Sequence, residues 1–275
     1  MSSRNVVAGR TAVITGAGSG IGRALAQHLS AMGCPVAACD WEEDGLEETI
    51  ASLPGQSLHR KLDVRDRQAQ LTWAADVAAW APSPIGVVIN NAGVTVSNSV
   101  TGGSPEDDEW VMDVNFWGVV NGTRAFLPIL QQQDSGVVVN VSSLFGIIAW
   151  PTQSAYNASK FAVRGFTESL RIELEGTGVS AITVHPGGVA THIVDNARFH
   201  VDDQGGTDHT KLQRDFNKVA RTTPKKAAQI IVTGVERGKD RILVGPDAVA
   251  MVTLSRILPN SYFDVIRKLM PLVRR

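Results

Sequence analysis

The chain has 275 residues, of which 43% are hydrophobic and 19% charged. This length permits one sizeable core, and the composition is typical of a folded globular protein rather than a disordered one. The 26 basic and 27 acidic residues nearly balance, so the net charge of −1 predicts no basic surface for nucleic acid. The two cysteines are too few for a disulfide framework, and the first ten residues contain no apolar signal core. These features favour a cytoplasmic protein.

Short apolar segments alternate with helical patterns along the first 190 residues. After the first segment, apolar residues recur at helical spacing between Ile21 and Met32, and they do so again between Trp73 and Trp80. Most of the segments lack polar alternation, as do strands that are buried on both faces of a parallel sheet. The predicted strands are 11–14, 35–39, 57–62, 85–89, 137–141, 180–184 and 241–244. The pattern predicts a single-domain α/β fold, with a doubly wound, Rossmann-type parallel sheet of about seven strands flanked by helices.

A glycine-rich turn follows the first predicted strand and opens a helix. Gly16, Gly20 and Gly22 have the spacing G-x-x-x-G-x-G, and Ile21 stands where the last glycine of G-x-G-x-x-G would be. Glycine lets the backbone approach a pyrophosphate closely, and the start of a helix supplies N–H groups and positive potential. A turn of this kind is weak evidence alone, but its place between a strand and a helix favours a nucleotide site.

Asp40 ends the second predicted strand, 24 positions after Gly16. A carboxylate at that place can accept hydrogen bonds from the adenosine ribose hydroxyls, and it repels a 2′-phosphate. Trp41, Glu42 and Glu43 follow it, so no basic residue is at hand for such a phosphate. The sequence therefore predicts NAD (NAD+/NADH) as the cofactor, preferred over NADP.

Tyr156 and Lys160 are four residues apart, so on a helix they share one face. An ammonium group beside a phenol favours the phenolate and lowers a phenol pKa that is otherwise about 10. Ser143 lies thirteen positions before Tyr156, just after a predicted strand, from where its hydroxyl can reach the following helix. Ser142 is the alternative, and the spacing favours Ser143. The arrangement indicates an oxidoreductase that acts on an alcohol or ketone.

Over roughly residues 11–191 these motifs resemble the short-chain dehydrogenase/reductase superfamily. The matches include the signature TGAGSGIG from Thr15 to Gly22, the pair Asp63-Val64 and the motif that begins at Asn90. The resemblance implies cofactor contacts from Gly16, Ser19, Gly20, Ile21, Gly22, Asp40, Asp63, Val64, Asn91, Ala92, Gly93, Tyr156, Lys160, Pro186, Gly187, Val189 and Thr191. It also implies a catalytic tetrad of Asn115, Ser143, Tyr156 and Lys160, with Asn115 on a helix that starts near Glu106.

The resemblance further implies a mechanism and an assembly. Tyr156 acts as general base in oxidation and general acid in reduction, and Lys160 with the positive nicotinamide lowers its pKa. Ser143 binds the substrate oxygen, and Asn115 anchors a water in a proton relay. Family members pair through the helices that bear Asn115 and Tyr156, so we expect a homodimer or a homotetramer.

The substrate is predicted to be a small hydrophobic alcohol or ketone, such as a steroid, a long-chain or an aryl-alkyl secondary alcohol. Residues 144–150, which include Phe145 and Trp150, follow Ser143 and are expected to line the substrate cleft with Ser143 and Tyr156. Val94, Phe199 and Phe216 can add apolar surface, although core packing explains such side chains equally well.

Two regions fall outside the strand–helix alternation. Residues 192–222 are polar and lack strong periodicity, so they are expected to form a substrate loop. Their acidic and histidine residues fit no metal-ligand spacing, and no metal site is predicted. We expect residues 1–247 to form the NAD-binding domain and residues 248–275 an amphipathic extension that packs on it. The extension can cover the substrate cleft, contact another subunit or touch a membrane surface, but no uncharged stretch in it reaches the roughly 20 residues of a membrane span.

Two other functions remain open. One is a reductase of long-chain aldehydes or acyl thioesters at a membrane surface, which the basic, apolar extension favours and Asp40 opposes. The other is an NAD(H)-binding sensor or scaffold without turnover, which the complete tetrad opposes.

Overall fold

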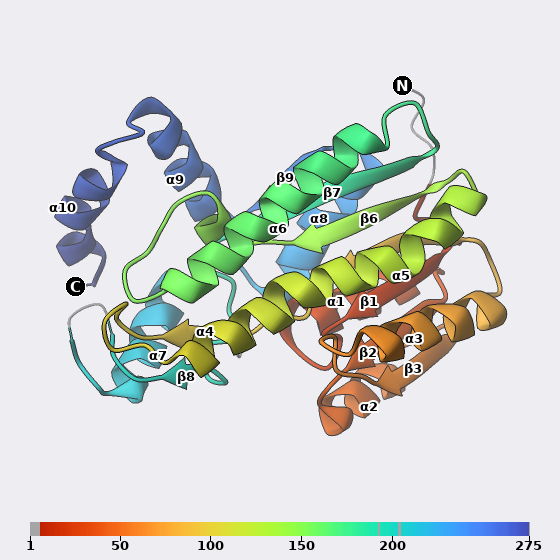
Figure 1. Cartoon of the computed structure of the whole chain (residues 1–275), viewed down its shortest axis with the longest axis horizontal. Helices are drawn as coiled ribbons and strands as arrows, with labels where there is room; N and C mark the ends of the chain where they lie inside the picture. The colour runs from red at the N-terminus through yellow and green to blue at the C-terminus, as the bar shows by residue number, and fades with distance from the viewer. Residues whose placement is uncertain (1–5, 192, 203–204, 275) are drawn as a thin grey trace.

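The computed structural model describes residues 6–191, 193–202 and 205–274, with side chains as far as residue 268. It forms one α/β domain around a parallel sheet in the order β3-β2-β1-β4-β6-β7-β9 (Figure 1). These strands are β1 (Thr11–Thr15), β2 (Val36–Asp40), β3 (Ser57–Lys61), β4 (Ile85–Asn90), β6 (Gly136–Val141), β7 (Val179–Pro186) and β9 (Arg241–Val244). All seven predicted strands are confirmed, with ends that differ by one or two residues.

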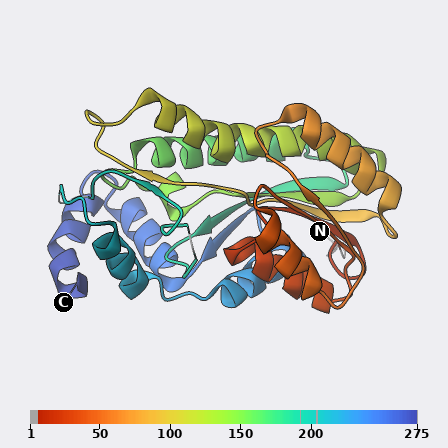
Figure 2. The same ribbon diagram turned by 90° about the horizontal axis from the view of Figure 1, so that it is seen from below.

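Helices cover both faces of the sheet, and Figure 2 shows the three layers from the side. One core contains Leu25 of α1 and Ile231 of α8, and the other contains Trp73 of α3, Phe126 of α5 and Leu170 of α6. The helices are α1 (Gly20–Ala31), α2 (Glu43–Ala51), α3 (Arg67–Trp80), α4 (Pro105–Met112), α5 (Gly118–Gln132), α6 (Ser154–Glu173), α7 (His209–Val219), α8 (Pro224–Glu236), α9 (Pro246–Ile257) and α10 (Tyr262–Arg274). A π-helical turn, η1 (Asp113–Trp117), joins α4 to α5, and a 3-10 turn, η2 (Leu144–Gly146), follows β6.

The polar region 192–222 contains more regular structure than its sequence predicts. Its described residues include helix α7, which is capped by the side chain of Asp208, and strand β8 (Arg198–Phe199), which pairs with β5 (Val96–Ser97). The segment predicted as a substrate loop thus contains a short strand and a helix among its described residues. A two-residue strand has no periodicity of its own, and α7 has no fully buried residue that would give it a strong apolar stripe.

The two helices of the extension pack beside the segment that follows β6. Val252 of α9 and Ile266 of α10 are buried in one cluster with Leu144 and Ile148. Ile257, an apolar residue of the extension, is exposed. The apolar residues Leu269, Met270 and Val273 lie outside the described side chains. Helices α7, α9 and α10 gather at one end of the molecule, to the left in Figure 1.

Candidate active site

The predicted cofactor residues lie along the carboxyl edge of the sheet. Because the strands are parallel and β2, β1, β4, β6 and β7 are successive neighbours, the residues that follow them form one row. Asp40 ends β2, the glycine-rich turn follows β1, and Asn91 follows β4. Ligands bind at this edge of an open parallel sheet, near the point where the strand order reverses.

The glycine-rich turn is closed so tightly that a side chain has no room. A Cβ on Gly22 would lie 1.9 Å from the carbonyl oxygen of Gly16. Ser19 caps α1 in an extended conformation without a capping hydrogen bond from its side chain, and Thr191 lies against Gly20. The turn thus presents the start of α1, including Ile21, as a compact anion site, with Thr191 of the loop after β7 beside it.

Asp40 is oriented by two backbone N–H groups. Gly18 donates to Oδ2 at 2.7 Å, and Glu42 donates to Oδ1 at 3.0 Å. The Arg65 guanidinium binds both oxygens of Asp63 and holds the pKa of that carboxyl below its ordinary value. Val64 is buried next to it. Both acidic side chains are therefore held in place at the end of the row near β2 and β3.

Asn91 and Ala92 tie the end of β4 to β1. Their N–H groups donate to the Thr15 hydroxyl at 3.0 and 3.1 Å, and the Asn91 side chain donates to the carbonyl oxygens of Thr15 and Gly16. At the next position, a Cβ on Gly93 would lie 3.2 Å from Lys160 Nζ. The missing side chain leaves space beside the ammonium group.

The structure brings Ser143, Tyr156 and Lys160 together. The Ser143 hydroxyl lies beside the Tyr156 phenol, whose pKa it lowers, and it accepts the N–H of Phe145 at 3.1 Å. Ser142 instead donates to the backbone oxygen of Lys160 at 2.8 Å. The geometry therefore pairs Ser143, and not Ser142, with the phenol.

Burial dominates the electrostatics of this site. Tyr156 is 9% exposed and Lys160 is 3% exposed. Burial raises the pKa of Tyr156, although the Ser143 hydrogen bond lowers it in part, and burial lowers the pKa of Lys160 to about 8. Nζ lies 5.7 Å from the centre of the Tyr156 ring and donates to the carbonyl oxygen of Val141 at 3.1 Å. In the protein alone the pKa of the phenol is thus raised, because the effect of burial exceeds that of Ser143.

Asn115 lies in the π-helical turn η1, which continues the helix that begins at Pro105, one residue before the predicted start near Glu106. Its side chain exchanges two hydrogen bonds with the backbone of Val94, at 2.8 and 2.9 Å, and donates to the Ser159 hydroxyl at 3.1 Å. Ser159 in turn donates to the backbone oxygen of Tyr156. Asn115 therefore joins three elements around the tetrad, and π-helical turns often occur at functional sites.

Two residues that support the site were missed from the sequence. His185, near the end of β7, donates from Nδ1 to the backbone oxygen of Ser143 at 2.8 Å. Burial lowers its pKa to about 4, so it is neutral. Asp247 accepts the N–H of Gly188 at 2.6 Å and so holds the loop after Pro186.

The remaining residues of this loop are also fixed. Gly187 donates its N–H to the carbonyl oxygen of Val244 at 2.9 Å. Val189 is buried and forms an isolated parallel bridge with Thr222. The loop after β7 thus runs from the sheet edge past the glycine-rich turn.

Aromatic side chains border Tyr156. Phe145 stacks on Trp150 with ring centres 5.7 Å apart and meets Tyr156 edge-on at 6.3 Å. Trp150 contacts Phe263 of α10 edge-on at 5.9 Å. Val94 packs against the cluster that holds Tyr156, whereas Phe199 stacks on His209 instead. The catalytic phenol therefore has an apolar neighbourhood that continues into the extension.

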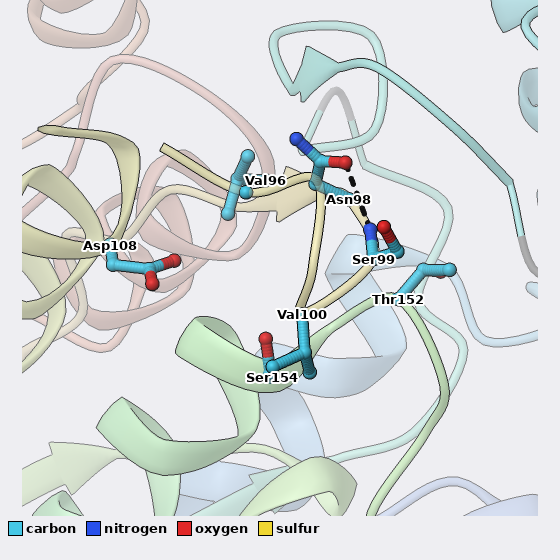
Figure 3. Close-up of a pocket in the computed structure, with 8 residues that line it drawn as sticks. Val96, Asn98, Ser99, Val100, Asp108, Thr152 and Ser154 are labelled. Atoms are coloured by element: carbon cyan, nitrogen blue, oxygen red, sulfur yellow. Dashed lines mark hydrogen bonds between the residues drawn. The ribbon is translucent and has the colours of Figure 1, made fainter. Parts of the chain in front are cut away.

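A small hollow of about 30 Å³ lies near this site, next to strand β5. Figure 3 shows the residues that line it, among them Asn98, Asp108 and Thr152. No tetrad residue lines the hollow. In the described parts of the chain, no three His, Cys, Asp or Glu residues are grouped so that they could hold a metal ion. Both cysteines are buried and free.

Comparisons with known proteins assign the chain to a family. The family model described as "short chain dehydrogenase" matches residues 10–201. The chain belongs to the short-chain dehydrogenase/reductase superfamily. "Putative oxidoreductase SadH" of Mycobacterium tuberculosis is 46% identical to this short-chain dehydrogenase/reductase over 260 residues, which span 92% of each chain. The chain is thus an oxidoreductase of a family that binds a nicotinamide cofactor.

Solved structures of the family resemble this one closely. A short chain dehydrogenase/reductase from Burkholderia phymatum in complex with NAD has a TM-score of 0.83 and 28% identity, over 92% of this chain and 95% of that one. A short chain dehydrogenase from Burkholderia cenocepacia in complex with NADP has a TM-score of 0.74 and 24% identity, over 91% and 94%. The second likeness shows the fold alone, and the two cofactors differ. Among the described residues, no helix has the length and apolar character that would let it cross a membrane.

Proposed function

We propose that this short-chain dehydrogenase/reductase transfers hydride between NAD and a hydrophobic secondary alcohol or ketone. The observation that carries the proposal is the Ser143 hydroxyl beside the Tyr156 phenol, with the buried Lys160 next to the phenol ring and Phe145 edge-on against it. Such a pair can bind a substrate oxygen and move its proton, and the apolar surroundings favour a hydrophobic substrate.

The roles of the chain's own groups follow from their positions. Tyr156 takes the hydroxyl proton of an alcohol at its phenol oxygen, or returns it to a ketone oxygen. Ser143 donates a hydrogen bond to the same substrate oxygen and stabilises the charge that develops there. Lys160, beside the open space at Gly93, can bind the hydroxyls of the nicotinamide ribose. NAD, when bound, accepts the hydride from the alcohol carbon or gives it back.

The glycine-rich turn and Asp40 fit the rest of NAD. A Cβ at Gly16 or Gly22 would clash with the backbone, so only glycine fits there and the turn can approach a pyrophosphate closely, while the Asp40 carboxylate can accept hydrogen bonds from ribose hydroxyls. The same carboxylate would repel a 2′-phosphate. The proposed preference for NAD rests on this carboxylate. The solved relatives do not decide it, since one is in complex with NAD and another with NADP.

Changing Asp40→Asn should lower the ratio of kcat/KM with NAD to that with NADP by about 10–100-fold, because hydrogen bonds to a charged acceptor are worth about 1.5–3 kcal/mol. Steady-state kinetics with both cofactors measures the ratio. Glu42→Gln removes an exposed charge two residues away and should leave the ratio unchanged. A ratio that stays constant in Asp40→Asn would show that this carboxylate does not select the cofactor.

The proposed substrate class is tested by a panel of alcohols. NADH formation at 340 nm is measured over steroid, aliphatic and aryl secondary alcohols, with NAD and with NADP. Turnover of one hydrophobic class with NAD is expected. If no alcohol is oxidised while NADH binds, the proposal fails, and a reductase of aldehydes or acyl thioesters, or a sensor without turnover, takes its place.

We also propose that this enzyme is a homo-oligomer that associates through the face of α6 and the neighbouring turn η1. Phe161 and Ile172 are eleven residues apart on α6 and share one side of the helix, and both are exposed, as is Trp117 of η1. Phe161→Glu should shift the protein towards monomers in sedimentation velocity. Leu71→Glu changes an equally exposed side chain on α3 and should have no such effect. Unaltered sedimentation of Phe161→Glu would place the contact elsewhere.

A further inference from the structure

A nearly buried carboxylate on α4 gathers residues from the segment that follows the loop after β7. Asp107 is 7% exposed, and its two oxygens bind different partners. Arg198 Nη1 donates to Oδ1 at 2.8 Å, and His200 Nε2 donates to Oδ2 at 2.7 Å. The Arg198 guanidinium also lies 3.9 Å from the centre of the Trp110 ring. We call these four residues the Asp107 cluster.

The Asp107 cluster lies where the segment 193–202 crosses the start of α4. Figure 1 shows α4 and β8 side by side. Strand β8 pairs with β5. The N–H groups of Arg198, His200 and Val201 donate to the carbonyl oxygens of residues 95 and 97. The Ser97 hydroxyl donates to the carbonyl oxygen of Val201 at 2.7 Å. The segment is therefore held at several points, and all of them lie within about one strand length of Asp107.

The inner side of this segment faces the catalytic tyrosine. Ile193 packs against the cluster formed by Val96, Val111, Ala155 and Tyr156. Trp110, which carries the Arg198 guanidinium on one side, packs against the same cluster. A chain of contacts thus runs from Asp107 through the segment and Trp110 to the apolar residues around Tyr156.

We propose that Asp107 is a positioning residue, which holds the segment 193–202 through Arg198 and His200 so that Ile193 forms part of the substrate wall beside Tyr156. Asp107 does not touch substrate or cofactor. It acts on substrate binding through the segment that it fixes. The inference rests on the proposed function, because it assigns a wall of the same site.

The charges at this place support a strong anchor. Burial alone would raise the pKa of Asp107, but the hydrogen bonds from Arg198 and His200 hold it below its ordinary value. The carboxylate is thus charged at neutral pH, and a charge so close to full burial is stable only while it is paired. Arg198 and His200 are about half exposed, so water can replace their bonds to α4 when the segment separates from it. The Asp107 carboxylate is nearly buried and would then lose both of these partners.

Two variants test the proposal in the full-length protein. Asp107→Ala removes the anchor, and Arg198→Ala removes its main partner from an exposed position on the segment. Hydrogen exchange of the Arg198, His200 and Val201 amides should become about tenfold faster in Asp107→Ala. Their hydrogen bonds to the carbonyl oxygens of residues 95 and 97 then open locally more often. The KM for the hydrophobic alcohol should rise by about tenfold with kcat within about twofold, because only the competent fraction of the enzyme changes. The Kd for NADH should stay constant in a fluorescence titration.

The controls separate a positioning role from a general loss of structure. Glu109→Gln removes an exposed charge from the same helix and should match the wild type in exchange and in KM. Arg198→Ala should reproduce both effects, and the double variant should be no worse than Asp107→Ala. Unchanged exchange and KM in both single variants would overturn the proposal, as would effects that add in the double variant. If the wild type oxidises no alcohol, the proposed function fails, while the exchange data still decide whether Asp107 holds the segment.

Discussion

Replacing Tyr156 by phenylalanine is expected to reduce alcohol oxidation by about 10²–10⁴-fold, the usual contribution of a positioned acid–base group. The substitution keeps the ring, which packs edge-on against Phe145, and removes only the hydroxyl that is paired with Ser143. NADH should therefore bind with nearly the wild-type Kd. Single-turnover absorbance at 340 nm and a fluorescence titration measure the two quantities on the same preparation.

The chain offers a matched control for this substitution. Its other tyrosine, Tyr262, lies on α10 and accepts the N–H of Ala149 at 3.2 Å. Tyr262→Phe removes the same hydroxyl outside the tetrad and should keep kcat within about threefold, since it leaves the acid–base group in place. Turnover that persists in Tyr156→Phe would refute the assignment of the acid–base group. If Tyr262→Phe loses as much activity as Tyr156→Phe, the loss in Tyr156→Phe is structural and does not come from the acid–base group.

The central strands could be predicted because they are buried on both faces. Segments such as 85–89 and 137–141 are short, apolar and without alternation, which only the centre of a parallel sheet explains. The strand β8 could not be found in this way. It has two residues, one of them the charged Arg198, and it exists because Asp107 and the backbone near Ser97 bind it.

The candidate site could be predicted for a similar reason. The residues that follow parallel strands meet at one edge, so positions as distant as Asp40 and Ser143 fall in one row. The local environment of each group could not be predicted. Spacing alone puts an ammonium beside Tyr156, but the structure puts Lys160 Nζ against the Val141 carbonyl and buries both side chains. Desolvation depends on everything that surrounds a group, and no motif records it.

Hydrogen bonds between a side chain and a distant backbone group could not be predicted from the sequence. His185 fixes Ser143 through a carbonyl oxygen, and Asp247 fixes Gly188 through an N–H group. Backbone groups are the same at every position, so a sequence pattern carries no sign of which one a distant side chain will bind. Such partners become visible only when the fold sets the distances.

Lys160 leads to a second large effect, in which stability and activity change in opposite directions. Burial lowers the pKa of its ammonium from 10.5 to about 8, so the folded protein holds a charged group in a place that disfavours charge. In the unfolded chain the same group keeps its proton up to higher pH. Below pH 8 this difference destabilises the folded state by about 3 kcal/mol, since each pKa unit corresponds to about 1.4 kcal/mol.

Lys160→Met should therefore make the cofactor-free protein more stable at pH 7, by about 1–3 kcal/mol, because methionine fills the space without a charge. The lost hydrogen bond to Val141 reduces the gain. Between pH 8 and 10.5 the unfolded chain binds more protons than the folded one, so the stability of the wild type rises with pH and the advantage of the variant shrinks. Urea unfolding at several pH values measures the difference.

Activity should move the other way, by about 10²-fold or more in kcat, because the variant lacks the ammonium that supports Tyr156 and can bind the nicotinamide ribose. Lys160 would then be a group that destabilises the protein alone and is kept for its chemistry. A variant that is less stable than the wild type at pH 7, or whose advantage does not change with pH, would contradict the buried charge as the cause. Full turnover in Lys160→Met would remove the lysine from the mechanism, whatever its effect on stability.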